Sequence, residues 1–244
     1  MAVRAMEPRE PRERGYYPND SFDNEHERVR LYQDPPPGPE FEKLYDDCHA
    51  AGGMSRYAYE DDPKRLAFTA ARYKHTAKLL EGCGHVLEVG CADGYFSRIV
   101  RQHVKDLTAI DVDAASIEEA KSHNTDRWHI DFVVSDIADA VMRWRGFDAV
   151  YALDVVEHIS PDNAFLAAMR DVASVAVIGI PSLESQAHAS RLSREGHVNC
   201  YSGADLKGRL KTYWKHVFMF TMHDEAIGTG YLPMANYLLA LCVK

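Results

Sequence analysis

Apolar and polar residues follow two alternating periods through most of the chain, and these periods predict an α/β fold. Short runs rich in valine and isoleucine have the length and composition of buried strands: "HVLEVG", "LTAIDV", "IDFVVSD", "FDAVYAL" and "SVAVIGIP". Between them lie stretches with apolar residues at helical spacing, such as "DAASIEEAKSH" and "SPDNAFLAAMRDVA". Strands that alternate with helices form a parallel sheet covered by helices on both faces.

The last part of the chain departs from this alternation. A helical stretch, "SGADLKGRLKTY", is followed by two strand-like runs, "KHVFMFTM" and "YLPMANYLLALCVK", with a short joint between them. Because that joint is too short for a crossover helix, we expect the two runs to pair antiparallel. The pattern therefore predicts a seven-stranded, mostly parallel sheet with an antiparallel last strand.

The first quarter of the chain differs in composition from the rest. Residues 1–62 hold 8 Lys and Arg against 15 Asp and Glu, and "DPPPGPE" is typical of a stiff linker. After a predicted helix in "FEKLYDDCHAAGG", the segment "GGMSRYAYEDDP" is expected to be a flexible loop, whose Tyr57 and Tyr59 are candidates for closing over a ligand. We therefore divide the chain into an acidic tail, linker and helical lid segment (1–62) and a main domain (63–244).

Composition narrows the class of protein further. The 244 residues are 46% hydrophobic and 27% charged, as in ordinary globular domains, and the net charge of −9 argues against binding to nucleic acid. The five cysteines are scattered without a C-x-x-C pair, which favours a reducing compartment over a zinc site. Because no run of about 18 apolar residues occurs, we expect a cytoplasmic protein with no membrane partner.

The turn after the first strand, "EVGCADG", is a candidate ligand site, since ligands bind beyond the carboxyl ends of parallel strands. Gly90 and Gly94 allow the backbone to turn tightly and approach a ligand. A dinucleotide site requires G-x-G-x-x-G, whereas here Ala92 replaces the middle glycine and Asp93 would repel a phosphate. Asp111, about twenty residues after the turn, can accept hydrogen bonds from ribose hydroxyls. The pattern favours a nucleoside that carries positive charge over a diphosphate.

These residues resemble a known family. From residue 63 to 244, the chain resembles the class I S-adenosylmethionine-dependent methyltransferases: "LEVGCADG" is similar to the first motif, "AIDVD" to the second-strand acid, "VVSDIAD" to the adenine-side motif and "FDAVYALDVVEHI" to the fourth-strand segment. The resemblance implies a Rossmann-like fold with S-adenosyl-L-methionine as cofactor. It places Asp111 at the ribose and Asp136 at the adenine amine, although Asp136 is equally a candidate helix N-cap. The cofactor-binding residues that the resemblance implies are Glu88, Gly90, Cys91, Ala92, Gly94, Asp111, Val112, Asp136, Ile137, Ala152 and Leu153.

Catalytic candidates follow the fourth strand in "ALDVVEHISP". Asp154, Glu157 and His158 are spaced i, i+3 and i+4, which predicts one shared helical face. His158 is our candidate general base, oriented by Glu157 or Asp154, since histidine titrates near neutral pH. Alternatively, the same three side chains ligate Mg²⁺ or another divalent cation, as in relatives with an E-x-x-E-H pattern, or they only cap the loop.

His197 in "EGHVNCYS" is a second catalytic candidate, because a similar H-x-x-x-[YF]-[ST] run occurs in ubiquinone-biosynthetic O-methyltransferases. Three other polar residues of the nearby loops are interpreted as ordinary surface residues: His188, His223 and Asp224. Cys91 is interpreted as a small space-filling residue of the cofactor turn, since no base lies beside it in the sequence.

The resemblance and the polar loops together favour one function over three alternatives. We expect an O-methyltransferase that acts on a hydroxyl of a sugar, glycan or glycosylated metabolite. A small phenol or quinol is the alternative acceptor. The further alternatives are an RNA 2′-O-methyltransferase, which the acidic balance disfavours, and a non-catalytic regulatory protein with the same fold. The oligomeric state is not predicted.

Overall fold

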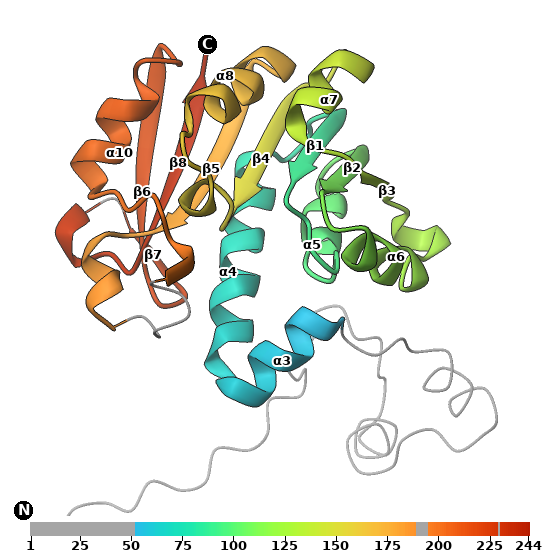
Figure 1. Ribbon diagram of the computed structural model, residues 1–244, viewed down its shortest axis with the longest axis horizontal. Helices are drawn as coiled ribbons and strands as arrows, with labels where there is room; N and C mark the ends of the chain where they lie inside the picture. Colours follow the sequence, from blue (N-terminus) through green and yellow to red (C-terminus); the bar gives the residue numbers. More distant parts are fainter. Residues whose placement is uncertain (1–51, 189–194, 229) are drawn as a thin grey trace, which may run out of the picture. The chain divides into compact units, whose positions relative to one another are not determined.

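The computed structural model of the protein describes residues 52–188, 195–228 and 230–244, without the side chain of residue 188. The fold is built on one eight-stranded sheet with the order β3-β2-β1-β4-β5-β8-β6-β7 (Figure 1). The strands are β1 (His85–Val89), β2 (Asp106–Asp111), β3 (Asp131–Val134), β4 (Ala149–Leu153), β5 (Val175–Pro181), β6 (His216–His223), β7 (Ala226–Gly228) and β8 (Tyr237–Val243).

The strand directions confirm a mostly parallel sheet. Strands β1 to β5 pair parallel to one another, and β8 pairs antiparallel with both β5 and β6. The expected pairing of the last two long runs is therefore confirmed, but the count of seven strands is short by one. The missed strand, β7, is three residues long and pairs antiparallel with the end of β6 across a turn at Asp224, whose φ is +56°. It lies in the segment that the sequence pattern assigned to a joint.

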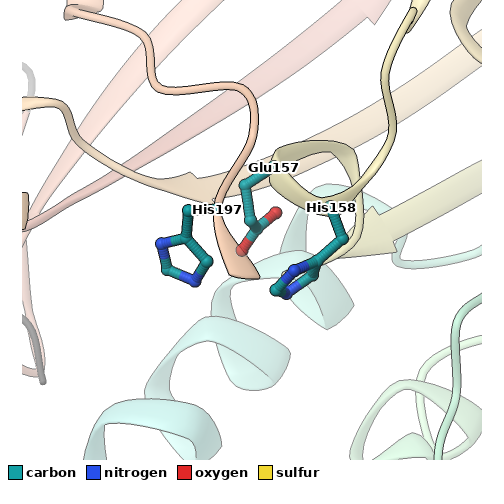
Figure 2. Close-up of side chains that lie close together, drawn as sticks. All are labelled: Glu157, His158 and His197. Carbon is teal, nitrogen blue, oxygen red and sulfur yellow. The ribbon is translucent and has the colours of Figure 1, made fainter. Parts of the chain in front are cut away.

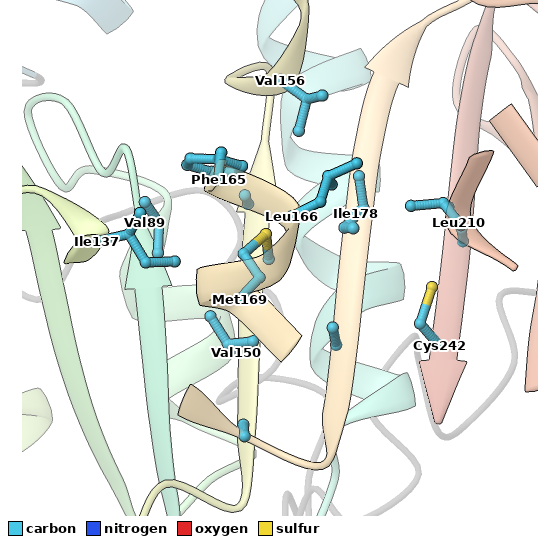
Figure 3. Close-up of a cluster of buried hydrophobic side chains, with 14 of the residues drawn as sticks. Val89, Ile137, Val150, Val156, Phe165, Leu166, Met169, Ile178, Leu210 and Cys242 are labelled. Atoms are coloured by element: carbon cyan, nitrogen blue, oxygen red, sulfur yellow. The ribbon is translucent and has the colours of Figure 1, made fainter. Parts of the chain in front are cut away.

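Helices cover both faces of the sheet, as predicted. One apolar cluster joins the sheet to α7 (Ile137–Arg143), α8 (Asn163–Val172) and α10 (Gly203–Leu210), with Phe165, Leu166 and Met169 of α8 fully or nearly fully buried against the strands (Figure 3). The cluster on the other face includes residues of α4 (Lys64–Leu79), α5 (Ser97–Arg101) and α6 (Ala114–Ser122). All five residues of β4 are buried, as is typical of a central strand covered on both faces.

The segment before the sheet differs from the prediction. The stretch "GGMSRYAYEDDP", expected to be a flexible loop, contains a helix, α3 (Gly53–Asp61), in which Tyr57 and Tyr59 are exposed. Helix α4 begins directly after Pro63, as expected for a proline at a helix start. The helix predicted in "FEKLYDDCHAAGG" lies almost wholly outside the described residues, as does the rest of the acidic N-terminal segment.

The strand order positions the candidate site. The chain runs outward from β1 to β2 and β3 on one side and from β4 to β5 on the other, so the order of the parallel strands reverses between β1 and β4. In open α/β sheets, the crevice at the carboxyl ends of the strands on either side of such a reversal is the usual ligand site. None of the described helices is long and apolar enough to cross a membrane.

Candidate active site

The turn between β1 and α5 is shaped by backbone conformations that most residues avoid. Gly90, Ala92 and Gly94 have φ values of +78°, +47° and +64°. A Cβ added at Gly90 would lie 2.3 Å from Val155 Cγ2, and one at Gly94 would lie 2.5 Å from the Phe132 ring. Both glycines are therefore required by close packing as well as by φ. The amides of Gly90 and Cys91 donate to the Ile110 carbonyl, which ties the start of the turn to β2.

Ala92 occupies a left-handed position in which the family has a glycine. The left-handed conformation destabilises the folded state by roughly 1–2 kcal/mol when the residue has a Cβ. Glycine avoids this strain, but it loses more conformational entropy on folding, which offsets part of the gain. We expect Ala92→Gly to raise the free energy of unfolding by about 0.5–1 kcal/mol, and Ala92→Val to lower it, in denaturant titrations. Equal stability of the glycine, alanine and valine forms would contradict this interpretation of the turn.

Asp111 fastens the turn to the end of β2. Its Oδ2 accepts a hydrogen bond from the Ala92 amide at 2.9 Å, and its Oδ1 accepts one from the Asp113 amide at 2.9 Å. A carboxylate oxygen can accept more than one hydrogen bond, so acceptor capacity remains for ribose hydroxyls. Asp113 in turn caps α6 by accepting from the amides of Ala115 and Ser116. The predicted ribose acid therefore ends β2 and is hydrogen-bonded directly to the turn after β1.

Glu88 lies at the opposite, buried side of the turn. Its carboxylate is only 1% exposed and accepts a hydrogen bond from the Tyr73 hydroxyl at 2.8 Å. Burial raises the pKa of Glu88 to about 6, against the opposite effect of the Ser97, Tyr151 and Tyr73 hydroxyls. A carboxylate that is held in this environment is costly to ionise unless a cation lies nearby. Glu88 therefore suits the positively charged end of a sulfonium amino acid.

The raised pKa of Glu88 predicts a loss of stability at higher pH. The neutral carboxyl is favoured in the folded state, so its contribution is complete below the unfolded pKa and is lost as pH rises through about 6. We expect this loss to be about 2 kcal/mol. About 1.3 kcal/mol of this loss falls between pH 5 and pH 8, so in Glu88→Gln the difference in unfolding free energy between these two pH values should shrink by about 1.3 kcal/mol, as measured by urea titration without cofactor. An unchanged difference would contradict the buried, neutral state of this side chain.

The other predicted cofactor residues lie at the same edge of the sheet. Val112 is exposed directly after β2, and Asp136 precedes α7, where it caps the helix by accepting from the Asp139 amide at 2.7 Å. The N-cap interpretation of Asp136 is therefore confirmed, and its contact with adenine stays a prediction. The remaining residues are buried in the turn, at the start of α7 and at the end of β4, and so offer mainly backbone groups or packing: Cys91, Ile137, Ala152 and Leu153.

The loop after β4 does not form the predicted helical face. Asp154 follows β4 with a φ of +57°, and its two carboxylate oxygens accept hydrogen bonds from one Arg72 nitrogen at 3.1 and 2.9 Å. The Arg72 guanidinium carbon also lies 3.8 Å from the centre of the Tyr237 ring. Asp154 thus pairs with α4. Among the described residues, the side chains close enough to share a metal ion are those of Glu157, His158 and His197, and Asp154 is not one of them.

Glu157 is a buried carboxylate without an internal partner. It lies in the short 3₁₀ helix η2 (Val156–His158), it is 2% exposed, and neither of its carboxylate oxygens has a hydrogen-bond partner within the described part of the chain. Burial and the negative charge of Asp154 raise the pKa of Glu157 to about 8, and Arg72 opposes this only partly. Since a buried carboxylate normally has partners, the group is one that a bound cation would satisfy.

Two histidines, His158 and His197, complete the cluster beside Glu157 (Figure 2). His158 Nδ1 lies 2.9 Å from the Gly196 carbonyl oxygen and His197 Nδ1 lies 3.0 Å from Gln186 Oε1. Because these oxygens only accept, each Nδ1 carries a proton, so in the neutral form of either ring the lone pair lies on Nε2. The ring centres are 5.0 Å apart, and potential ligand atoms of Glu157, His158 and His197 lie within 4.8 Å of one another.

This arrangement fits a divalent cation. Burial and the neighbouring His158 lower the pKa of His197, which keeps its ring neutral, as a metal ligand must be. Hydrogen bonds from the non-ligating nitrogens of metal-bound histidines to oxygen acceptors are the usual way in which such rings are oriented. The expected carboxylate partner of the His158 ring is replaced by the Gly196 carbonyl. The donor set, one carboxylate and two imidazoles, is suited to several divalent metals.

Sequence reasoning missed the residues that hold the two halves of this cluster together. The Asn199 side-chain amide donates to the Val156 and Ile159 carbonyls, and the amides of Val198 and Asn199 both donate to the Glu157 carbonyl. The only sequence signal was the position of Asn199 two residues after His197. Of the loop residues interpreted as surface, Asp224 is exposed and accepts from Asn236, which agrees with that interpretation.

Comparison with known proteins agrees with this geometry. Residues 86–175 match the family model described as a methyltransferase domain. Nodulation protein S of Sinorhizobium fredii is 27% identical over 59% of this chain and 69% of its own length. The ubiquinone biosynthesis O-methyltransferase of Xanthomonas campestris pv. campestris is 32% identical over 51% of this chain, and the matched region spans 49% of that relative. The methyltransferase domain of bacterial CtHen1-C superposes with a TM-score of 0.59 at 17% identity, over 72% of this chain and 98% of that domain.

The sheet order, the glycine turn and the acid that ends β2 define a nucleoside-binding domain with a Rossmann-like fold. Residues 86–175, which match the family model, therefore form a methyltransferase domain, and the fold around them is that of the class I S-adenosylmethionine-dependent methyltransferases.

Proposed function

We propose that the protein is an O-methyltransferase that uses S-adenosylmethionine and a divalent cation bound by Glu157, His158 and His197. The observation that carries this proposal is the buried carboxylate of Glu157, without a partner among the described residues, beside two histidines whose Nδ1 atoms lie at hydrogen-bond distance from oxygen acceptors. In such a site the cofactor supplies the methyl group, and the cation lowers the pKa of the acceptor hydroxyl.

The chain's own residues position the reactants. The glycine turn and Asp111 hold the nucleoside, while Glu88 faces the charged amino-acid end of the cofactor. The η2 turn follows β4, the strand next to β1, so Glu157 and His158 lie near the place where the methyl group would be presented. Holding the acceptor close and aligned with that group is the main requirement of an in-line transfer. Asp154 and Arg72 fix the start of this loop.

The chemistry of the cluster favours an aliphatic hydroxyl, such as that of a sugar or glycan. A phenol loses its proton near pH ~10, whereas an aliphatic hydroxyl needs a base or a metal to do so near neutral pH. A cation at this cluster would therefore assist the deprotonation of an aliphatic hydroxyl more than that of a phenol. A phenol or quinol is the second candidate, because Leu183 and Val198 expose apolar surface, at 47% and 56%, next to the segments that carry the cluster.

The RNA and non-catalytic alternatives are less well supported. The likeness to the CtHen1-C domain concerns the fold alone, and the net charge of −9 is unfavourable for binding a polyanion. A purely regulatory protein would not need a buried carboxylate and two histidines whose potential ligand atoms lie within 4.8 Å of one another. Both alternatives are outcomes of the assay described next.

The test is a turnover assay that measures S-adenosylhomocysteine release with nucleotide sugars, glycans, phenols and RNA as acceptors, after EDTA treatment and with added Mg²⁺ or Mn²⁺. We expect release with a hydroxyl acceptor, and stimulation by the cation. His158→Ala and His197→Ala should weaken the apparent affinity for the cation. Cation-independent turnover that His158→Ala abolishes would instead assign His158 as a general base, and no turnover with any acceptor would favour the non-catalytic alternative.

A further inference from the structure

The first turn of α3 is capped by two side chains that are distant in the sequence. The Gly53 amide donates to Glu119 Oε1 at 2.7 Å, and the Ser55 amide donates to Asp93 Oδ2 at 3.0 Å. These are two of the amides that a helix cannot pair internally. The N-cap residue, Gly52, has no side chain to accept from them, and the first turn of α3 contains no acidic residue. The capping groups of α3 therefore come from elsewhere in the fold.

Close packing shows that this contact is specific. A Cβ on Gly52 would lie 2.3 Å from Asp93 Oδ2, and one on Gly53 would lie 3.2 Å from Glu119 Oε2. Asp93 and Ser55 are both buried, at 5% and 4% exposure. The two glycines thus allow the helix end to approach the two carboxylates. The negative charges also interact favourably with the positive end of the helix dipole.

The two capping acids come from the elements that form the cofactor site. Asp93 lies inside the glycine turn, where its other oxygen accepts from the Tyr95 amide at 3.1 Å. Glu119 lies on α6, which begins three residues after Asp111 and is capped by Asp113. The same end of α3 is therefore fastened to the β1 turn and to the helix after β2. Figure 1 shows α3 against the start of α4 and below α5 and α6, off the carboxyl ends of the strands.

We propose that Asp93 and Glu119 are positioning residues that hold α3 as a lid segment over the cofactor site, so that docking of α3 and binding of the cofactor favour each other. An isolated helix of nine residues is marginal in water, so α3 depends on these caps for its order. A cofactor that fixes the turn and the end of β2 fixes both capping acids, and it thereby stabilises α3. This inference rests on the proposed S-adenosylmethionine site, and it assigns to Asp93 a role other than contact with the cofactor.

The test compares the wild-type protein with Glu119→Ala, Glu119→Gln and the matched control Glu118→Ala, whose side chain is exposed on the same helix. Two quantities are measured: the Kd for S-adenosylhomocysteine by calorimetry, and the rate of trypsin cleavage after Arg56 in α3, with and without that ligand. Melting temperatures confirm that each variant is folded.

We expect S-adenosylhomocysteine to slow cleavage at Arg56 in the wild-type protein. Glu119→Ala should be cleaved about tenfold faster, should lose this protection and should bind the ligand about tenfold more weakly, which is the effect of losing one helix cap. Glu119→Gln keeps an acceptor oxygen and should recover part of both effects, whereas Glu118→Ala should behave as the wild-type protein does.

Unchanged cleavage and unchanged ligand affinity in Glu119→Ala would overturn the inference. If the wild-type protein did not bind S-adenosylhomocysteine at all, the proposed function and its coupling to α3 would both fail, and the cleavage rates without ligand would still show whether Glu119 caps α3.

Discussion

Glu157→Gln is expected to lower cation-stimulated methyl transfer at least ~100-fold, because it removes the charged ligand of the proposed cation site. The same substitution should leave the melting temperature at pH 7 unchanged or raise it. Burial and Asp154 raise the pKa of Glu157 to about 8, so the carboxyl of the cation-free protein is neutral at pH 7, and glutamine has nearly the same shape. Loss of activity without loss of stability distinguishes a functional residue from a structural one.

The pH dependence of stability gives this prediction a second readout. Because the pKa of Glu157 is raised, its neutral form contributes stability that is complete below the unfolded pKa and is lost as pH rises through about 8. In Glu157→Gln this loss should be absent. The matched control is Glu225→Gln, a change of the same chemistry at an exposed position of the β6–β7 turn. Wild-type turnover in Glu157→Gln, with unchanged cation dependence, would contradict the proposed site.

Asp111→Ala is expected to weaken S-adenosylhomocysteine binding at least ~50-fold. The substitution removes the predicted acceptor of the ribose hydroxyls and the hydrogen bonds from the Ala92 and Asp113 amides that fasten the cofactor turn. Hydrogen bonds to a charged acceptor contribute about 1.5–3 kcal/mol each, which sets the scale of the effect. Calorimetric titration of the two proteins with S-adenosylhomocysteine measures it.

Asp106→Asn is the control for that experiment, because Asp106 is exposed at the opposite, amino-terminal end of the same strand. It should bind S-adenosylhomocysteine as the wild-type protein does. An equal loss of affinity in Asp106→Asn would show that the effect of Asp111→Ala is a general loss of stability. Undiminished binding by Asp111→Ala would remove the ribose assignment.

The strands, their directions and the cofactor turn could be predicted because their signals are local. Buried strands such as β4 and β5 are short apolar runs, and a glycine-bounded turn after β1 marks the carboxyl edge of the sheet. β7 was missed because three residues are too few to give a period. α3 was missed because its caps, Asp93 and Glu119, lie far from it in the sequence, whereas the usual start signals of a helix are adjacent residues.

The candidate cluster was predicted only in part, because some of its contacts are local in the sequence and others are not. Glu157 and His158 are adjacent, and His197 was recognised from its motif, but their approach depends on Asn199, which is bonded to the η2 turn across about 40 residues of chain. Asp154 was grouped with them by spacing alone. Its pairing with Arg72, 82 residues earlier, is a tertiary contact that no local pattern contains.

The measurement that tests the central claim most directly is anomalous scattering from crystals of the full chain grown with S-adenosylhomocysteine and Mn²⁺. The proposed function predicts one anomalous peak that is coordinated by the Glu157 carboxylate and by Nε2 of His158 and His197, and that is absent in Glu157→Gln. Mn²⁺ bound only at other sites, with these three side chains unliganded in the cofactor complex, would contradict it.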